Sequence, residues 1–249
     1  MFSVYLFIFV FGLIAGSFLN VVIFRQGTGR TLSGRSGCLS CGGNLRWYEL
    51  LPVASFIIQR GRCRQCGSPI SWQYPLVELL TGILFAVIYF VFQVSPLMVV
   101  FFWLVSCLLI IIAVYDFRHK IIPNSSVYLL ILFGLARALA TRDWSGLITG
   151  AVIGLLFFAI WRLSVGRWLG FGDVKLALGL GLLTGPMQGL SALVISVWLG
   201  AGIGLALIAL GKTGLFSRFK SFTMKSELPF APFLIAGFLA SILFNWHVF

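Results

Sequence analysis

Eight long apolar runs dominate this sequence. The hydrocarbon core of a bilayer is about 30 Å thick, so an α-helix needs about 20 mostly apolar residues to cross it. The eight runs lie at residues 2–24, 76–94, 97–115, 125–141, 146–162, 173–186, 188–210 and 230–247. We therefore predict an all-α polytopic membrane protein with about eight transmembrane helices.

The composition excludes the soluble classes of protein. Of the 249 residues, 60% are hydrophobic and only 10% are charged, whereas soluble domains carry about 25% charged residues. A cytosolic enzyme, a disordered tail and a small disulfide-rich secreted domain are therefore excluded. Nucleic-acid binding is not expected despite the net charge of +12, because the basic residues are scattered through short loops.

The positions of the basic residues predict how the helices cross the membrane. The first apolar run has its first charge, Arg25, at its far end, so we expect a retained helix with its N-terminus outside. If all eight runs cross, four loops are cytoplasmic: 25–75, 116–124, 163–172 and 211–229. In or beside these loops lie 16 of the 18 Lys and Arg residues, in agreement with the positive-inside rule. This agreement requires the short run at 173–186 to cross.

Four cysteines form two CxxC pairs on the longest of these loops. They are Cys38, Cys41, Cys63 and Cys66, with 21 residues between the pairs. Two such knuckles, with glycines after each pair for tight turns, can offer four thiolates to one tetrahedral Zn²⁺. Because no position is left open, we expect the metal to be structural. Two disulfides, a redox motif and unrelated thiols are the alternatives, and the expected reducing cytoplasm disfavours disulfides.

Only six residues are acidic, so each of them is informative. They are Glu49, Glu78, Asp116, Asp143, Asp173 and Glu227. Asp116 and Asp173 are both expected at cytoplasmic ends of apolar runs, where they can meet across a helix bundle. Carboxylates in membrane segments are costly and are functional candidates by default. A facing pair shares a proton and provides one general base and one general acid.

Other chemistry has little support in the sequence. The chain contains two histidines and neither an HExxH nor a GxSxG motif, so the carboxylate pair is the strongest candidate for catalysis. Each aspartate also has a simpler possible role. Asp116 can pair with Arg118 or Lys120, and Asp173 can cap the N-terminus of a helix.

Six segments in order resemble the bacterial type IV prepilin peptidases, which are GxGD aspartic proteases that also N-methylate the cleaved pilin. They are FGLIAGSFLNVVIFR at 11–25, the double CxxC, PISWQYPLVELLTG at 69–82, DFRHKIIPN at 116–124, GFGDVK at 170–175 and ELPFAPFL at 227–234. The resemblance covers nearly the whole chain. It differs from frequent family residues at Leu50, Asn124 and Ala231.

The resemblance implies roles for individual residues. Asp116 and Asp173 match the catalytic pair, and Gly170 and Gly172 match the active-site loop that lets the second aspartate approach the first. The four cysteines match a zinc-binding insert that accompanies methyl transfer in many members. S-adenosylmethionine is the implied methyl donor, and Glu49 is a candidate for contacting it.

The resemblance also implies an organisation and a substrate. It comprises a first helix at 1–24, a cytoplasmic zinc-binding loop at 25–75 associated with methyl transfer, and a membrane-embedded peptidase domain at 76–249. The substrates would be type IV prepilins or pseudopilins, cut after a leader Gly on the cytoplasmic side of the bacterial inner membrane. Expected partners are these substrates and membrane lipid. The alternatives are an ion- or proton-coupled transporter that uses the two Asp as a relay, and a peptidase without methyl transfer.

Overall fold

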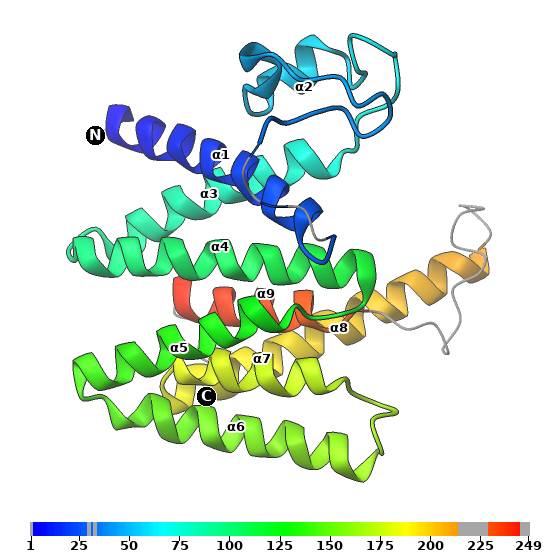
Figure 1. The fold of residues 1–249 in the computed structure, drawn as a ribbon. Coiled ribbons are helices and arrows are strands. Elements are labelled where there is room, and N and C mark those ends of the chain that lie inside the picture. The colour runs from blue at the N-terminus through cyan, green and yellow to red at the C-terminus, as the bar shows by residue number, and fades with distance from the viewer. Residues whose placement is uncertain (1, 29–30, 32–33, 214–228, 245–249) are drawn as a thin grey trace. The chain divides into compact units, whose positions relative to one another are not determined.

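The computed structural model describes residues 2–28, 31, 34–213 and 229–244, and these residues form helices without a β-strand. The elements in chain order are α1 (Phe2–Arg25), η1 (Trp47–Leu50), α2 (Ala54–Ile58), α3 (Gln73–Phe92), α4 (Pro96–His119), α5 (Asn124–Thr141), α6 (Trp144–Leu163), α7 (Phe171–Leu182), α8 (Pro186–Thr213) and α9 (Ala231–Leu243). The all-α architecture is therefore confirmed (Figure 1).

Each of the eight predicted runs forms a helix, but two of these helices are short. In the described part of the chain, six are long and apolar enough to cross a membrane: α1, α3, α4, α5, α6 and α8. Helix α7 has 12 residues and α9 has 13, which at 1.5 Å per residue is about 18–20 Å. The predicted run at 173–186 ends early because Pro186 opens the next helix, and the residue before a proline disfavours helical geometry.

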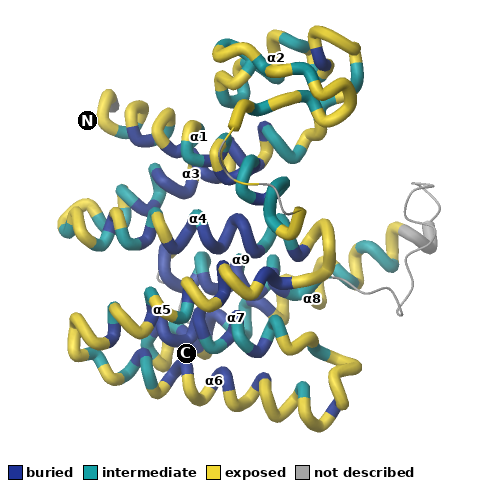
Figure 2. Tube along the Cα trace, in the orientation of Figure 1, coloured by how far each residue is buried: buried dark blue, intermediate teal, exposed yellow. Residues whose placement is uncertain are grey.

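The chain divides into two compact units, Met1–Ile111 and Ile112–Phe249, called unit 1 and unit 2 below. In unit 1, α1 and α3 pack along each other, and buried positions (dark blue in Figure 2) lie where they meet. The approach is close because α1 presents glycine there. A Cβ atom at Gly12 would lie 2.7 Å from the Cα atom of Gly82. Small residues let helix backbones approach in this way.

In unit 2, α7 is sheltered by its neighbours. Helices α5, α6 and α7 lie side by side (Figure 1). A Cβ atom at Gly181 of α7 would lie only 2.7 Å from the Cα atom of Gly150 in α6. Helix α7 also packs against α9, which in turn pairs with α8. A helix too short to span the bilayer is stable here because protein surrounds it.

Candidate active site

The two aspartates singled out by the sequence both lie in unit 2, at the ends of helices. Asp116 is in the last turn of α4, and Asp173 is the third residue of α7. Helix α4 ends where Lys120 takes a left-handed conformation with φ of 53°, a common way to terminate a helix. Pro123 then precedes α5. Both aspartates therefore lie at helix ends, as predicted from the ends of their apolar runs.

The structure brings these two carboxyl groups together. They are close enough to interact electrostatically. Asp116 is only 5% exposed, and its Oδ2 has no hydrogen-bond partner among the described residues. Its carboxyl group also lies close to the main-chain N–H of Ala231, at the start of α9. A buried carboxyl oxygen without a partner is suited to binding a water molecule or a substrate group.

Asp173 also has the simpler role that the sequence left open. Its Oδ2 accepts a hydrogen bond of 3.2 Å from the main-chain N–H of Gly170, and this bond caps the N-terminus of α7. The cap fixes the position of the side chain, and the N-terminal end of a helix favours negative charge. Capping and interaction with Asp116 are therefore compatible in the same residue.

The two glycines of the GFGD segment provide space. Gly170 has an ordinary φ of −74°, so it is not required for a left-handed conformation. A Cβ atom at Gly172 would lie 2.9 Å from the Cβ atom of Ile122, in the segment that joins α4 to α5. A Cβ atom at Gly170 would lie 3.3 Å from the Asp173 Oδ2. Both glycines thus allow close approach around Asp173.

If the aspartate pair carries out the peptide cleavage that the resemblance implies, Gly172→Ala should lower its rate. The added methyl group must push the start of α7 away from Ile122, and a misplacement of about 1 Å in a catalytic group costs about 100-fold in rate. Gly202→Ala in α8 is the matched control, because nothing lies within 4 Å of a Cβ atom there. Equal cleavage rates for the two variants and the wild type would show that the close packing does not position Asp173.

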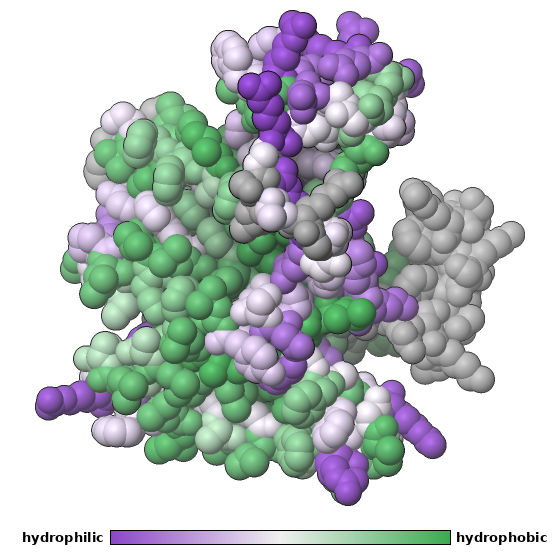
Figure 3. Space-filling model, in the orientation of Figure 1, coloured by the Kyte–Doolittle hydropathy of each residue, from purple (hydrophilic) through white to green (hydrophobic). Residues whose placement is uncertain are grey.

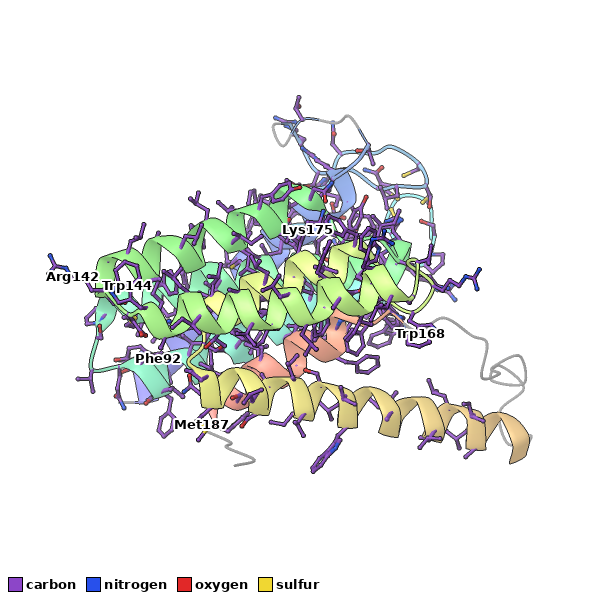
Figure 4. The ribbon with its side chains drawn as sticks, turned by 90° about the horizontal axis from the view of Figure 1, so that it is seen from below. Phe92, Arg142, Trp144, Trp168, Lys175 and Met187 are labelled. Atoms are coloured by element: carbon purple, nitrogen blue, oxygen red, sulfur yellow. The ribbon has the colours of Figure 1, made fainter. Side chains whose placement is uncertain are left out.

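A second contact joins α7 to the region around Ile122 and the start of α5, and it was not predicted. The Nζ atom of Lys175 donates a hydrogen bond to the Oδ1 atom of Asn124 at the start of α5. It also lies 5.2 Å from the ring centroid of Tyr128 and 5.4 Å from that of Phe171. Lys175 and Trp168 lie at one end of the unit 2 helices, with Arg142 and Trp144 at the other (Figure 4). Both residues lie in segments that carry the family resemblance, but their contact cannot be read from the sequence.

The cysteine pairs meet as predicted. The sulfur atoms of Cys38, Cys41, Cys63 and Cys66 all lie within 4.8 Å of one another. The Sγ atoms of Cys38 and Cys66 are 3.9 Å apart, close to the spacing of about 3.8 Å expected for tetrahedral Zn²⁺ with Zn–S bonds of about 2.3 Å. The loop that carries them is mostly hydrophilic (purple at the top of Figure 3). The donor set and its spacing fit a zinc ion.

The two knuckles have the same backbone pattern. The N–H of Gly42 donates to the carbonyl of Cys38, and the N–H of Gly67 donates to the carbonyl of Cys63. Both glycines have positive φ, 72° and 70°, which explains why glycine follows each pair. Hydrogen bonds from the main-chain N–H groups of Cys41 and Ser40 lower the pKa of Cys38 to about 6. The thiolate, which is the form that binds metal, is therefore favoured at Cys38. At Cys41 the hydrogen bond with the Cys66 thiol raises the pKa to about 11.

Glu49, the candidate contact for the methyl donor, is held within the loop that carries the four cysteines. One carboxylate oxygen accepts a 2.8 Å hydrogen bond from the N–H of Arg46, and the other lies 4.0 Å from the Nε atom of Arg64. Its side chain is 6% exposed. These contacts stabilise the short helix η1. Glu227, at the start of the last matched segment, lies outside the described residues.

Comparisons with known proteins show the family to which this chain belongs. Residues 10–92 match the bacterial peptidase A24 N-terminal domain, and residues 103–205 match the type IV leader peptidase family. A prepilin leader peptidase/N-methyltransferase of Bacillus subtilis is 34% identical over 96% of this chain and 93% of that protein. The protein of the same name from Myxococcus xanthus is 39% identical over 84% of this chain and 64% of its own length. The one from Burkholderia pseudomallei (strain 1026b) is 33% identical over 96% of this chain and 85% of its own length.

No solved structure matches the chain. The aspartate pair and the cysteine cluster fall in the two matched regions, the cysteines in 10–92 and the aspartates in 103–205. The chain belongs to the type IV leader peptidase family, and it is a multi-pass membrane protein.

Proposed function

We propose that this chain is an aspartic endopeptidase that removes the basic leader of type IV prepilins or pseudopilins after a Gly, and then methylates the new N-terminal amine. The observation that carries the proposal is the pair of interacting carboxyl groups at helix ends in unit 2, one of them with a buried oxygen that lacks a partner. The printed names of the relatives, prepilin leader peptidase/N-methyltransferase, support both activities.

The proposed cleavage uses only Asp116 and Asp173. One carboxylate takes a proton from water, and the oxygen of that water attacks the carbonyl carbon of the scissile bond. The other carboxyl group, protonated at the start, donates its proton to the carbonyl oxygen. Collapse of the tetrahedral intermediate breaks the C–N bond, and the leaving amine receives a proton from the dyad. Gly170 and Gly172 keep the approach to Asp173 open.

The positions of the carboxyl groups favour this reaction over transport. A relay for protons or cations is expected near the middle of the membrane, whereas Asp116 lies in the last turn of α4 and Asp173 in the first turn of α7. Water, a reactant in hydrolysis, reaches a carboxyl group at the end of a membrane helix more readily than one near its middle. The transporter hypothesis has no comparable support from the described residues.

We further propose where the two activities are located in the cell and in the chain. The protein lies in the bacterial inner membrane with its N-terminus outside and the cysteine loop in the cytoplasm. The four cysteines hold one structural Zn²⁺, which keeps the segment 25–75 folded for methyl transfer, while 76–249 carries the peptidase. S-adenosylmethionine supplies the electrophilic methyl group when it is bound.

Purified protein incubated with a prepilin tests the proposed peptidase. We expect a shortened product whose N-terminal sequence begins directly after the leader Gly. A prepilin that stays intact in the presence of folded, detergent-solubilised protein would contradict the proposal. Cleavage at scattered positions would indicate a contaminating protease.

A further inference from the structure

Glu78 is a buried carboxylate of unit 1 that the proposed cleavage does not use. It lies in the second turn of α3 and is 6% exposed. Helix α1 covers it closely, since a Cβ atom at Gly16 would lie 2.7 Å from the Cα atom of Glu78. Ionisable residues at such positions in membrane proteins are rare and usually serve a function.

The groups that face Glu78 are neutral. Its Oε2 accepts a 2.7 Å hydrogen bond from the main-chain N–H of Val53, and the Ser17 side chain of α1 is its other partner. Nearby on α1, Asn20 donates to the carbonyl of Tyr74 and accepts from Gln73. Among the described residues these neutral donors are not joined by a cationic partner of Glu78, so the site is suited to a cationic group.

The loop segment that Glu78 holds is strained. Val53 has φ of 59° and ψ of −48°, a positive-φ conformation that is costly for a β-branched residue. Such a conformation persists only where the surroundings enforce it, and it occurs most often at functional sites. Val53 lies between the two cysteine pairs, so Glu78 connects the zinc-binding loop with the crossing of α1 and α3.

Glu78 lies apart in the sequence from the two aspartates, in a position available for a reaction at the new N-terminus. It lies five residues into α3, about 7.5 Å from the start of the helix. Its region, 10–92, matches the N-terminal family domain, whereas both catalytic aspartates lie outside that region. A buried carboxylate separate from the cleavage dyad is thus available for a second step. Removing a leader exposes an α-amine, which is largely a cation near pH 7.

We propose that Glu78 binds this ammonium group of the processed pilin and accepts its proton before methyl transfer. This inference rests on the proposed function. Glu78 takes one proton from the ammonium nitrogen, which frees its lone pair. The nitrogen then attacks the methyl carbon of a sulfonium donor, the C–S bond breaks, and its electron pair remains on sulfur as a thioether. The product is a methylated ammonium group.

Glu78→Gln is the variant that tests the inference, because glutamine keeps the size of the side chain and an oxygen that can accept from Val53. Leader cleavage should stay within about twofold of the wild type, whereas methyl transfer at pH 7 should fall by about 100-fold, a typical contribution of a general base. In the absence of donor, the processed pilin should also bind the variant about tenfold more weakly. Thr81→Val, one turn away, is the control for packing.

The dependence on pH separates a base from a structural support. Raising the pH from 7 to 9 deprotonates most of the α-amine without help, so methyl transfer by Glu78→Gln should recover about tenfold. The partners of Glu78 among the described residues, the main-chain N–H of Val53 and the hydroxyl group of Ser17, do not titrate in this range.

Three results would overturn the inference. These are unchanged methyl transfer by Glu78→Gln, an equal loss at pH 7 and pH 9, and a joint loss of cleavage and methyl transfer. The last two would assign Glu78 a structural role. If the wild type itself cleaves but never methylates, the proposed methyl transfer fails instead, and the measurement on the wild type identifies this case.

Discussion

Replacement of Asp116 by Asn, or of Asp173 by Asn, is expected to lower leader cleavage by about 10²–10⁴-fold. Each substitution keeps the size of the side chain but removes a group that must either take or give a proton. Because the two carboxyl groups act as a unit, the double variant should be little worse than either single variant. Rates are measured from the conversion of a prepilin to its mature form.

Asp143→Asn is the matched control for these variants. Asp143 lies at the start of α6, where its Oδ1 accepts hydrogen bonds from the N–H and the hydroxyl group of Ser145. This variant should cleave at the wild-type rate, and all variants should remain helical and inserted in the membrane. Normal cleavage by either Asp116→Asn or Asp173→Asn would remove the dyad from the mechanism.

Loss of the zinc site should have the second large effect. Cys41→Ser and Cys66→Ser each remove one of four thiolates, and structural Zn²⁺ sites contribute about 10–16 kcal/mol in small zinc-binding peptides. We expect the wild type to contain about one Zn²⁺ per chain and each variant to lose it. Methyl transfer should be lost with the metal, while leader cleavage should persist because both aspartates lie in unit 2.

Cys107→Ser is the control for the cysteine variants, since Cys107 lies within α4 and outside the cluster. Metal content is measured by mass spectrometry of the purified protein, and folding of the loop by its resistance to proteolysis. A metal-free wild type with full methyl-transfer activity would contradict the zinc proposal.

Much of the fold could be predicted from hydropathy, because each apolar run as a whole must be buried in protein or lie in lipid. All eight runs are helices, with ends that differ by a few residues. The length of α7 was overestimated, because Leu183, Thr184 and Gly185 are apolar or small and extend the run without continuing the helix. Hydropathy alone does not show where a helix sheltered by neighbours stops.

The candidate site was predictable where a motif names the residue, and unpredictable where packing brings distant segments together. The cysteine cluster followed from spacing, because each CxxC knuckle is local. The contact between Gly172 and Ile122 and the hydrogen bond between Lys175 and Asn124 join segments about 50 residues apart in sequence. The proximity of Ala231 to Asp116 is likewise a product of the fold.

Glu49 and Glu78, two carboxylates of unit 1, show the same limit of prediction from sequence. The sequence suggested Glu49 as a contact for the methyl donor, because it lies between the cysteine pairs. In the structure its oxygens are engaged by Arg46 and Arg64. Glu78, which had no assigned role, is buried and faces neutral partners. Burial and hydrogen-bond partners, which sequence does not provide, distinguish the two residues.

The central claim is that one chain removes a leader and then methylates the exposed amine. The most direct test is the intact mass of a purified prepilin after incubation with this protein, with and without S-adenosylmethionine. We predict loss of the leader in both samples, and addition of one methyl group only when the donor is present. An unchanged prepilin mass in both samples, with folded protein and Zn²⁺ bound, would contradict the account.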